Sequence, residues 1–264
     1  FQKVATKSYL PMLQILKKLL KQEAHFNFAL SCSGVFLEQA QAYQPEVIKL
    51  LQDLVQTGRV EMLAETYYHS LAALYSESEF VAQVKQQRAL LWQLFKVRPK
   101  VFRNTELIYS NHIGYLVGKM GYLGMLTEAV DRYLHHRPKT KIYVSHPFEV
   151  GGSEQVLPLL LKHPQLSDDI AFRFSDRQWS NYPLSAEKFL GWVAKYHNDE
   201  VLNLFMDFET FGEHQWADSG IFDFFQSFVH LFLQQKWNAF VTPTHLFKQW
   251  QREQLKTTVA SHAQ

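Results

Sequence analysis

Short strand-like runs alternate with longer amphipathic stretches along this chain, and this alternation constrains the fold more than any other feature. The strand-like runs occupy residues 25–31, 59–65, 100–106, 123–129, 169–175 and 201–208. The predicted helices between them include PEVIKLLQDLVQTG, SEFVAQVKQQRALLWQLF, NHIGYLVGKMG and SAEKFLGWVAKYH. This pattern is typical of an α/β fold built on a mostly parallel sheet.

The chain opens with a predicted helix, because Leu13, Leu16 and Leu20 follow helical spacing. In a repeat of strand followed by helix, an initial helix implies that a strand precedes it. We therefore expect an incomplete TIM-type (β/α)7 barrel that lacks its first strand. The length of 264 residues suits one barrel domain over residues 1–264.

Residues 130–168 interrupt the alternation of strands and helices. The segment is rich in Pro, His and basic residues, and only IYVSH within it reads as a short strand. Long insertions in barrels usually lie over the functional face, so this segment is a candidate substrate loop.

The charge balance and the cysteine count exclude several classes of partner. The 27 basic and 25 acidic residues give a net charge of +2 without a basic patch, so we expect neither nucleic acid nor an anionic membrane as partner. The one cysteine, Cys32, lies in an apolar run and reads as a small buried hydrophobe, so no disulfide forms within the chain. No signal peptide or membrane-spanning run is present, and we expect a cytoplasmic location.

The densest group of titratable residues follows the last predicted strand. Asp207, Glu209, Glu213 and His214 lie within eight positions in LNLFMDFETFGEH. The carboxyl ends of barrel strands line the open mouth of the barrel, and crowded carboxylates raise one another's pKa. Asp207 could instead be a helix N-cap, but four titratable groups are too many for one cap.

A second carboxylate, Glu106, ends the predicted strand KVFRNTE. On an extended strand it shares a face with Asn104. It could be a structural residue paired with Arg103 or Arg173, because an unpaired interior charge is costly. Two carboxylates at strand ends, Glu106 and Asp207, instead suggest a carboxylate-pair hydrolase.

Metal and cofactor sites are not favoured by the sequence. Glu61, Glu65 and His69 stand four apart and would form one stripe on a helix, but the residues around Glu61 fit a strand better. His112 and His214 lack any HExxH or Cys/His ligand spacing, and no GxSxG elbow or glycine-rich phosphate loop occurs. We expect no metal and no cofactor.

Three further residues have two readings each. Arg173 could hold a catalytic carboxylate ionised or form an internal salt bridge. Trp179 and Trp216 could stack on a sugar ring or pack in the core.

Four segments resemble glycoside hydrolase family 57, in its α-amylase-like branch, and they occur in the order of that family. They are GRVEMLAETYYHSL, VFRNTELIYSN, LSDDIAFRFSDRQWSNYPL and LFMDFETFGEHQWADSGIF. The resemblance implies a seven-stranded incomplete barrel, an α-1,4-glucan or maltooligosaccharide substrate, and a retaining mechanism. It implies Glu106 as nucleophile, Asp207 as general acid/base and Glu61 near the substrate. The residues expected to contact substrate are then Glu61, Arg173, Trp179, Glu209, His214 and Trp216.

The sequence also departs from that family. The His-Gln-Pro motif of the first strand is absent, and no counterpart of the C-terminal helical region is evident beyond Phe240. We therefore expect residues 1–264 to be a fragment of a catalytic barrel. A non-catalytic glucan-binding barrel and a metal-dependent polysaccharide deacetylase remain alternatives, and the sequence predicts no oligomeric state.

Overall fold

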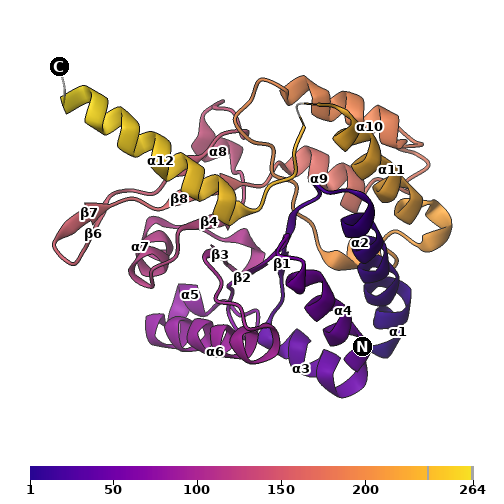
Figure 1. The fold of residues 1–264 in the computed structure, drawn as a ribbon, viewed down its shortest axis with the longest axis horizontal. Coiled ribbons are helices and arrows are strands. Elements are labelled where there is room, and N and C mark those ends of the chain that lie inside the picture. The colour runs from indigo at the N-terminus through magenta and orange to yellow at the C-terminus, as the bar shows by residue number, and fades with distance from the viewer. Residues whose placement is uncertain (237, 263–264) are drawn as a thin grey trace.

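The computed structural model describes residues 1–236 and 238–262, with side chains up to residue 254. It is an α/β fold in which helices surround a mostly parallel sheet (Figure 1). The parallel strands are β1 (Phe28–Ser31), β2 (Val60–Leu63), β3 (Val101–Arg103), β4 (Gly124–Thr127) and β8 (Pro158–Leu161). They neighbour one another in this order, with a single bridge from Ala64 to Phe102 joining β2 to β3.

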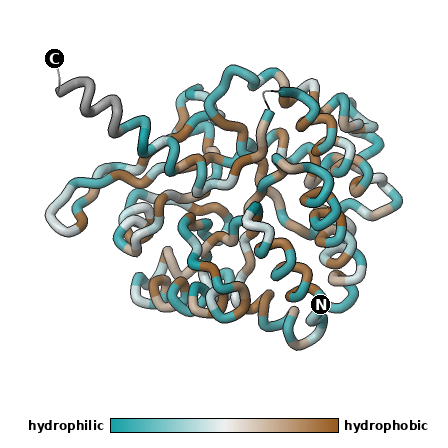
Figure 2. The backbone as a smooth tube through the Cα atoms, viewed as in Figure 1, coloured by the Kyte–Doolittle hydropathy of each residue, from teal (hydrophilic) through white to brown (hydrophobic). Residues whose placement is uncertain are grey.

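The first four strands lie inside the predicted runs, and the predicted helices are also present. The longer helices are α2 (Leu10–Gln22), α3 (Gly34–Tyr43), α4 (Pro45–Gln56), α6 (Glu77–Phe95), α7 (Asn111–Lys119), α10 (Ala186–Val193) and α11 (Ile221–Gln234). The short ones are α1 (Gln2–Val4), α5 (Ala72–Tyr75) and α8 (Asp131–Leu134). Figure 2 shows hydrophobic and hydrophilic residues alternating along the outer helices, as expected when one face of each is buried.

The predicted strand at 169–175 is wrong. These residues begin inside helix α9 (Pro164–Ala171), whose first-turn proline suits a helix start. The His163 side chain accepts a hydrogen bond from Leu166 N at 3.3 Å and so caps the helix. The alternation of apolar and polar residues in AFRFS therefore does not form a strand, because Pro164 and the capping His163 start a helix a few residues earlier.

The predicted strand at 201–208 forms no ladder in the described residues. Val201 N donates to Thr140 O at 3.1 Å, and His163 N donates to Asn203 O at 2.8 Å. The segment therefore runs beside the end of β8 without regular pairing, and it ends in the short 3-10 helix η4 (Phe208–Thr210).

The segment 130–168 holds more structure than the single short strand predicted at IYVSH. That strand is β5 (Tyr143–Val144), which pairs antiparallel with β8. A hairpin of β6 (Phe148–Val150) and β7 (Ser153–Gln155) projects from the body (Figure 1). Strand β8 itself belongs to the parallel sheet, so the predicted insertion contains part of the core.

The parallel strands do not form a closed barrel in the described residues. Within the described part of the chain, strand β1 pairs with β2 only. A largely apolar cavity of about 1430 Å³ lies between β1 and the segment 202–208. No described helix has the length and apolar content needed to cross a membrane.

The last helix, α12 (Pro243–His262), packs against one end of the parallel strands. The sequence analysis did not predict this helix. Its Phe247 is fully buried in a cluster with inward-facing leucines and a valine from the strands, namely Leu63, Val101, Leu126 and Leu160. Gly124 provides the space for the ring, because a Cβ there would lie 2.3 Å from Phe247. The phenyl ring and the missing side chain of the glycine are therefore complementary.

We expect Phe247→Ala to lower the free energy of unfolding by about 3–5 kcal/mol, because it leaves a cavity in the core. Gly124→Ala should cost about 1–3 kcal/mol through overlap with the ring. The double variant should cost less than the sum, since removing the ring removes the overlap. Urea unfolding measures all three, with the exposed Tyr75→Ala as control, expected within about 0.5 kcal/mol of wild type. Strict additivity would contradict the packing described.

Candidate active site

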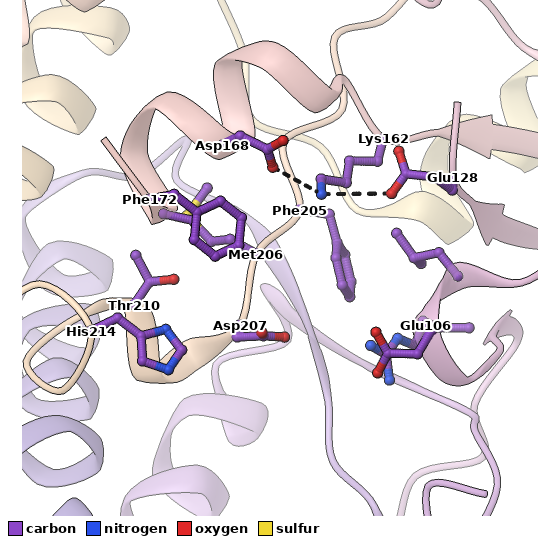
Figure 3. A pocket seen from close by; sticks show the side chains of 13 residues that line it. Glu106, Glu128, Lys162, Asp168, Phe172, Phe205, Met206, Asp207, Thr210 and His214 are labelled. Atoms are coloured by element: carbon purple, nitrogen blue, oxygen red, sulfur yellow. Dashed lines mark ion pairs between the residues drawn. The ribbon is translucent and has the colours of Figure 1, made fainter. Parts of the chain in front are cut away.

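A small cavity of about 140 Å³ lies where the parallel strands end, and polar side chains line it (Figure 3). Glu106 follows β3, Glu128 follows β4 and Lys162 follows β8. Asp207 comes from the segment beside β8 and His214 from the turn after η4. The carboxyl ends of parallel strands are where α/β folds place functional groups.

Glu106 lies on a strained turn. It belongs to the short 3-10 turn η2 (Thr105–Leu107), and its φ of +53° and ψ of +24° are left-handed. Such a conformation costs a non-glycine residue about 1–3 kcal/mol and persists only where neighbours enforce it. Here Thr66 and Thr105 share a hydrogen bond of 3.0 Å, and Thr105 donates to Ser70 O at 2.7 Å. These bonds fasten the turn after β3 to the turn after β2.

Asp207 points into the cavity, toward Glu106 (Figure 3). It precedes η4, yet its side chain makes no capping hydrogen bond to that helix. The capping alternative for Asp207 is therefore not what the structure shows.

The neighbouring carboxylates have partners on the N-terminal helices. Glu209 accepts a short hydrogen bond from the hydroxyl of Tyr9, whose pKa is raised mainly by burial. Glu213 pairs with Lys7 at 2.7 Å, and this hydrogen bond lowers the pKa of Glu213. Both carboxylates thus fasten residues 208–213 to the N-terminal helices.

Beside Glu106 lies a cluster that sequence reasoning did not assign to the site. Glu65, 2% exposed, accepts from Ser31 at 2.7 Å and lies 3.0 Å from Nδ1 of His69. The other ring nitrogen of His69, Nε2, lies 3.2 Å from Oε1 of Glu106. The hydrogen bond with Glu65 is the main cause that raises the pKa of His69. The signals for this cluster were the strand-end position of Glu65 and its spacing of four from His69.

The opposite wall of the cavity carries a lysine between two carboxylates. Lys162 Nζ lies 3.2 Å from Asp168 and 3.6 Å from Glu128 (Figure 3). Sequence reasoning missed all three residues. Lys162 directly follows β8, so a prediction that included β8 as a strand would have placed Lys162 at a strand end.

Glu61 lies near the other end of the sheet and lines neither cavity. It accepts hydrogen bonds from Thr244 N at 2.8 Å and from Thr244 Oγ1 at 2.5 Å, at the start of α12. Burial raises the pKa of Glu61, and the bonds from Thr244 oppose that rise. In this structure Glu61 therefore fastens α12 to β2.

The remaining predicted residues are dispersed. Arg173 forms an internal salt bridge with Asp169 at 2.7 Å. Trp179 packs edge-on against Trp192 with ring centroids 5.9 Å apart. Trp216 is 60% exposed, and the ammonium of Lys7 lies 5.0 Å from its ring centroid. None of these three residues lines the small cavity, whereas His214 does.

No group of three or more His, Cys, Asp or Glu side chains within the described part of the chain could hold a metal ion. The cavity is lined by the carboxylates of Glu106 and Asp207, by the imidazole of His214, and by Lys162 held between two further carboxylates. This set can attack, protonate and hydrogen-bond a polyhydroxylated ligand.

The family model for "Glycosyl hydrolase family 57" matches residues 1–260. The chain belongs to this family, which confirms the resemblance seen in the four sequence segments. A relative from Methanocaldococcus jannaschii, named "Putative alpha-amylase", is 42% identical over 225 residues. That match covers 85% of this chain and 46% of the relative, so the chain spans less than half of that protein.

Solved structures share the fold at low sequence identity. A 4-alpha-glucanotransferase from Thermococcus litoralis superposes with a TM-score of 0.75 at 17% identity, covering 94% of this chain and 37% of that one. A GH57-type branching enzyme from Pyrococcus horikoshii gives a TM-score of 0.72 at 13% identity, covering 94% of this chain and 65% of that one. These likenesses confirm the α/β architecture.

The buried Glu61 should make stability depend on pH in a defined direction. Its raised pKa means that the folded state favours the protonated acid. The unfolding free energy of wild type relative to Glu61→Gln should therefore fall as pH rises from about 4.3, the ordinary Glu value, through the raised pKa. Urea unfolding at several pH values measures this difference, with Glu46→Gln on the exposed face of α4 as control. A difference that rises with pH would contradict this reading of Glu61.

Proposed function

We propose that the chain carries the catalytic centre of a retaining glycosidase that acts on α-1,4-glucans. The observation that supports this most is the pair Glu106 and Asp207, facing each other across one cavity of a family 57 chain (Figure 3). The names of the relatives, an alpha-amylase and a 4-alpha-glucanotransferase, favour a glucan or maltooligosaccharide as substrate.

In the proposed first step, a carboxylate oxygen of Glu106 attacks the anomeric carbon. The glycosidic bond breaks, and Asp207 gives its proton to the departing oxygen. The product is a glycosyl ester of Glu106. In the second step Asp207 removes a proton from water or from a sugar hydroxyl, whose oxygen displaces Glu106. Water gives hydrolysis and a sugar gives glucan transfer, and both fit the same two carboxylates.

We propose that substrate is held by polar and aromatic groups around this pair. His214 beside Asp207, and Lys162 between Glu128 and Asp168, present donors to sugar hydroxyls. Phe172 lines the cavity and is 65% exposed, which suits a ring that stacks on a sugar. Predicted substrate contacts of Glu61, Arg173, Trp179, Glu209 and Trp216 stay predictions.

We further propose that the sheet is an incomplete TIM-type (β/α)7 barrel without its first strand. Among the residues that the structure describes, strand β1 has one strand neighbour, and the cavity of about 1430 Å³ separates it from residues 202–208. A strand parallel to β1 in that space would give both edges a partner and complete the ring.

In the whole protein, Asp207→Asn should lower kcat on maltoheptaose by about 10²–10⁴-fold, the usual contribution of a positioned proton donor. Glu106→Ala should be at least as impaired, and added azide should restore turnover with inverted product stereochemistry. Mass spectrometry and NMR of the products measure both effects. Asp223→Asn, exposed on α11, is the matched control and should match wild type. Near-normal turnover by either catalytic variant would refute the assignment.

A non-catalytic glucan-binding barrel makes a different prediction in the same experiment. The wild-type protein would then bind maltoheptaose without releasing any product. A metal-dependent deacetylase would lose activity on chelation, whereas the proposed glycosidase should keep its rate in EDTA.

A further inference from the structure

Two strained residues from different turns meet beside the cavity. His69 has a φ of +51° and Glu106 a φ of +53°, and their side chains are in hydrogen-bond contact at 3.2 Å. Left-handed backbone in such residues is unfavourable, and it concentrates at functional sites. The threonine hydrogen bonds between the two turns hold both conformations at once. The backbone conformations of the two turns therefore bring the side chains of His69 and Glu106 into contact.

The far side of the His69 ring faces two groups of opposite charge. Nδ1 lies 3.0 Å from Oε2 of Glu65 and 3.1 Å from a guanidinium nitrogen of Arg103. It cannot donate to one and accept from the other in the same protonation state. In the charged ring, Nδ1–H donates to Glu65. In the neutral ring, the Nδ1 lone pair accepts from Arg103. In both states the other proton stays on Nε2, opposite Glu106.

We propose that His69 is a positioning residue for Glu106, held by Glu65 and Arg103 so that Nε2–H donates to Oε1 of Glu106 whether the ring is charged or neutral. This rests on the proposed role of Glu106 as nucleophile. With Oε1 occupied by the imidazole, Oε2 is the oxygen left to attack the anomeric carbon.

Glu106 depends on this contact for its orientation. Its side chain is 71% exposed, and within the described residues His69 is its one hydrogen-bonding partner. A free glutamate side chain would sample several rotamers. Glu65, by contrast, is 2% exposed and accepts from both Ser31 and His69, so the anchor behind the imidazole is rigid.

The electrostatics of the cluster agree with the geometry. Among the described residues, the titratable groups in contact with the ring are Glu65, Arg103 and Glu106. The hydrogen bond with Glu65 raises the pKa of His69 most, burial and Arg103 lower it, and Glu106 raises it further. The charged form of the ring is favoured by both carboxylates.

NMR titration of the ring protons tests the contact without using activity. The pKa of His69 should fall in Glu65→Gln and fall less in Glu106→Gln, because each variant removes a carboxylate from the ring. Glu77→Gln, in the exposed pair with His112 at 2.8 Å, is the matched control and should leave His69 unmoved. Should Glu65→Gln fail to fold, Glu106→Gln alone decides, since that side chain is exposed. An unchanged His69 titration in Glu106→Gln overturns the proposal.

Kinetics on maltoheptaose in the whole protein test the positioning role. His69→Ala should lower kcat about 10²-fold, the typical cost of a misplaced reacting group, with little change in KM. His69→Gln places an amide N–H where Nε2 lies and should recover about tenfold of that loss. His69→Asn places its amide at Nδ1, facing Glu65, and should recover none. Equal rates for the Gln and Asn variants, or wild-type kcat in His69→Ala, overturn the proposal.

The two tests separate this proposal from the proposed function. A coupled His69 titration in a protein without any glucan turnover refutes the glycosidase assignment alone. Turnover by a protein whose His69 titrates independently of Glu106 refutes the positioning role alone.

Discussion

The parallel pairing of β2 with β3 is the constraint on which the rest of the site depends. Ala64 N donates to Val101 O at 2.9 Å, and Arg103 N donates to Ala64 O at 2.8 Å. These bonds make the two strands end at the same level, so the turns that follow them lie next to each other. Glu65, Thr66 and His69 lie two to six positions beyond the end of β2, and Thr105 and Glu106 lie two and three positions beyond the end of β3.

Much of the fold could be predicted from local sequence patterns, and the predictions that were wrong have identifiable causes. The first four parallel strands combine apolar runs with glycine or proline boundaries, and the structure places them as predicted. Residues 169–175 alternate like a strand, but Pro164 and the capping His163 start a helix before them. Strand β8 was hidden because Pro, His and basic residues surround it. Sheet membership depends on neighbours across space, which a single sequence does not display.

The candidate site divides along the same line. That Glu106 and Asp207 lie near each other could be predicted, because each follows an apolar run that leads to the same end of the sheet, and both line one cavity. Glu61 lies four residues before Glu65, so both side chains point to the same face of the sheet. Glu61, however, lies near the opposite end of that face and contacts α12. The role of His69 could not be predicted, because it depends on a left-handed turn and on a partner 37 residues away.

The bond between Glu61 and Thr244 has a consequence for how the chain folds. It joins residues 183 positions apart, so the contact forms only after the chain has been made as far as Thr244. Until α12 has been made and has docked, the apolar space that Phe247 fills is open at one end, and Glu61 lacks its hydrogen-bond partner Thr244. During synthesis on the ribosome the growing sheet therefore presents an unsealed hydrophobic face. Docking of α12 is the step that removes this face from the reach of chaperones and of other unfolded chains.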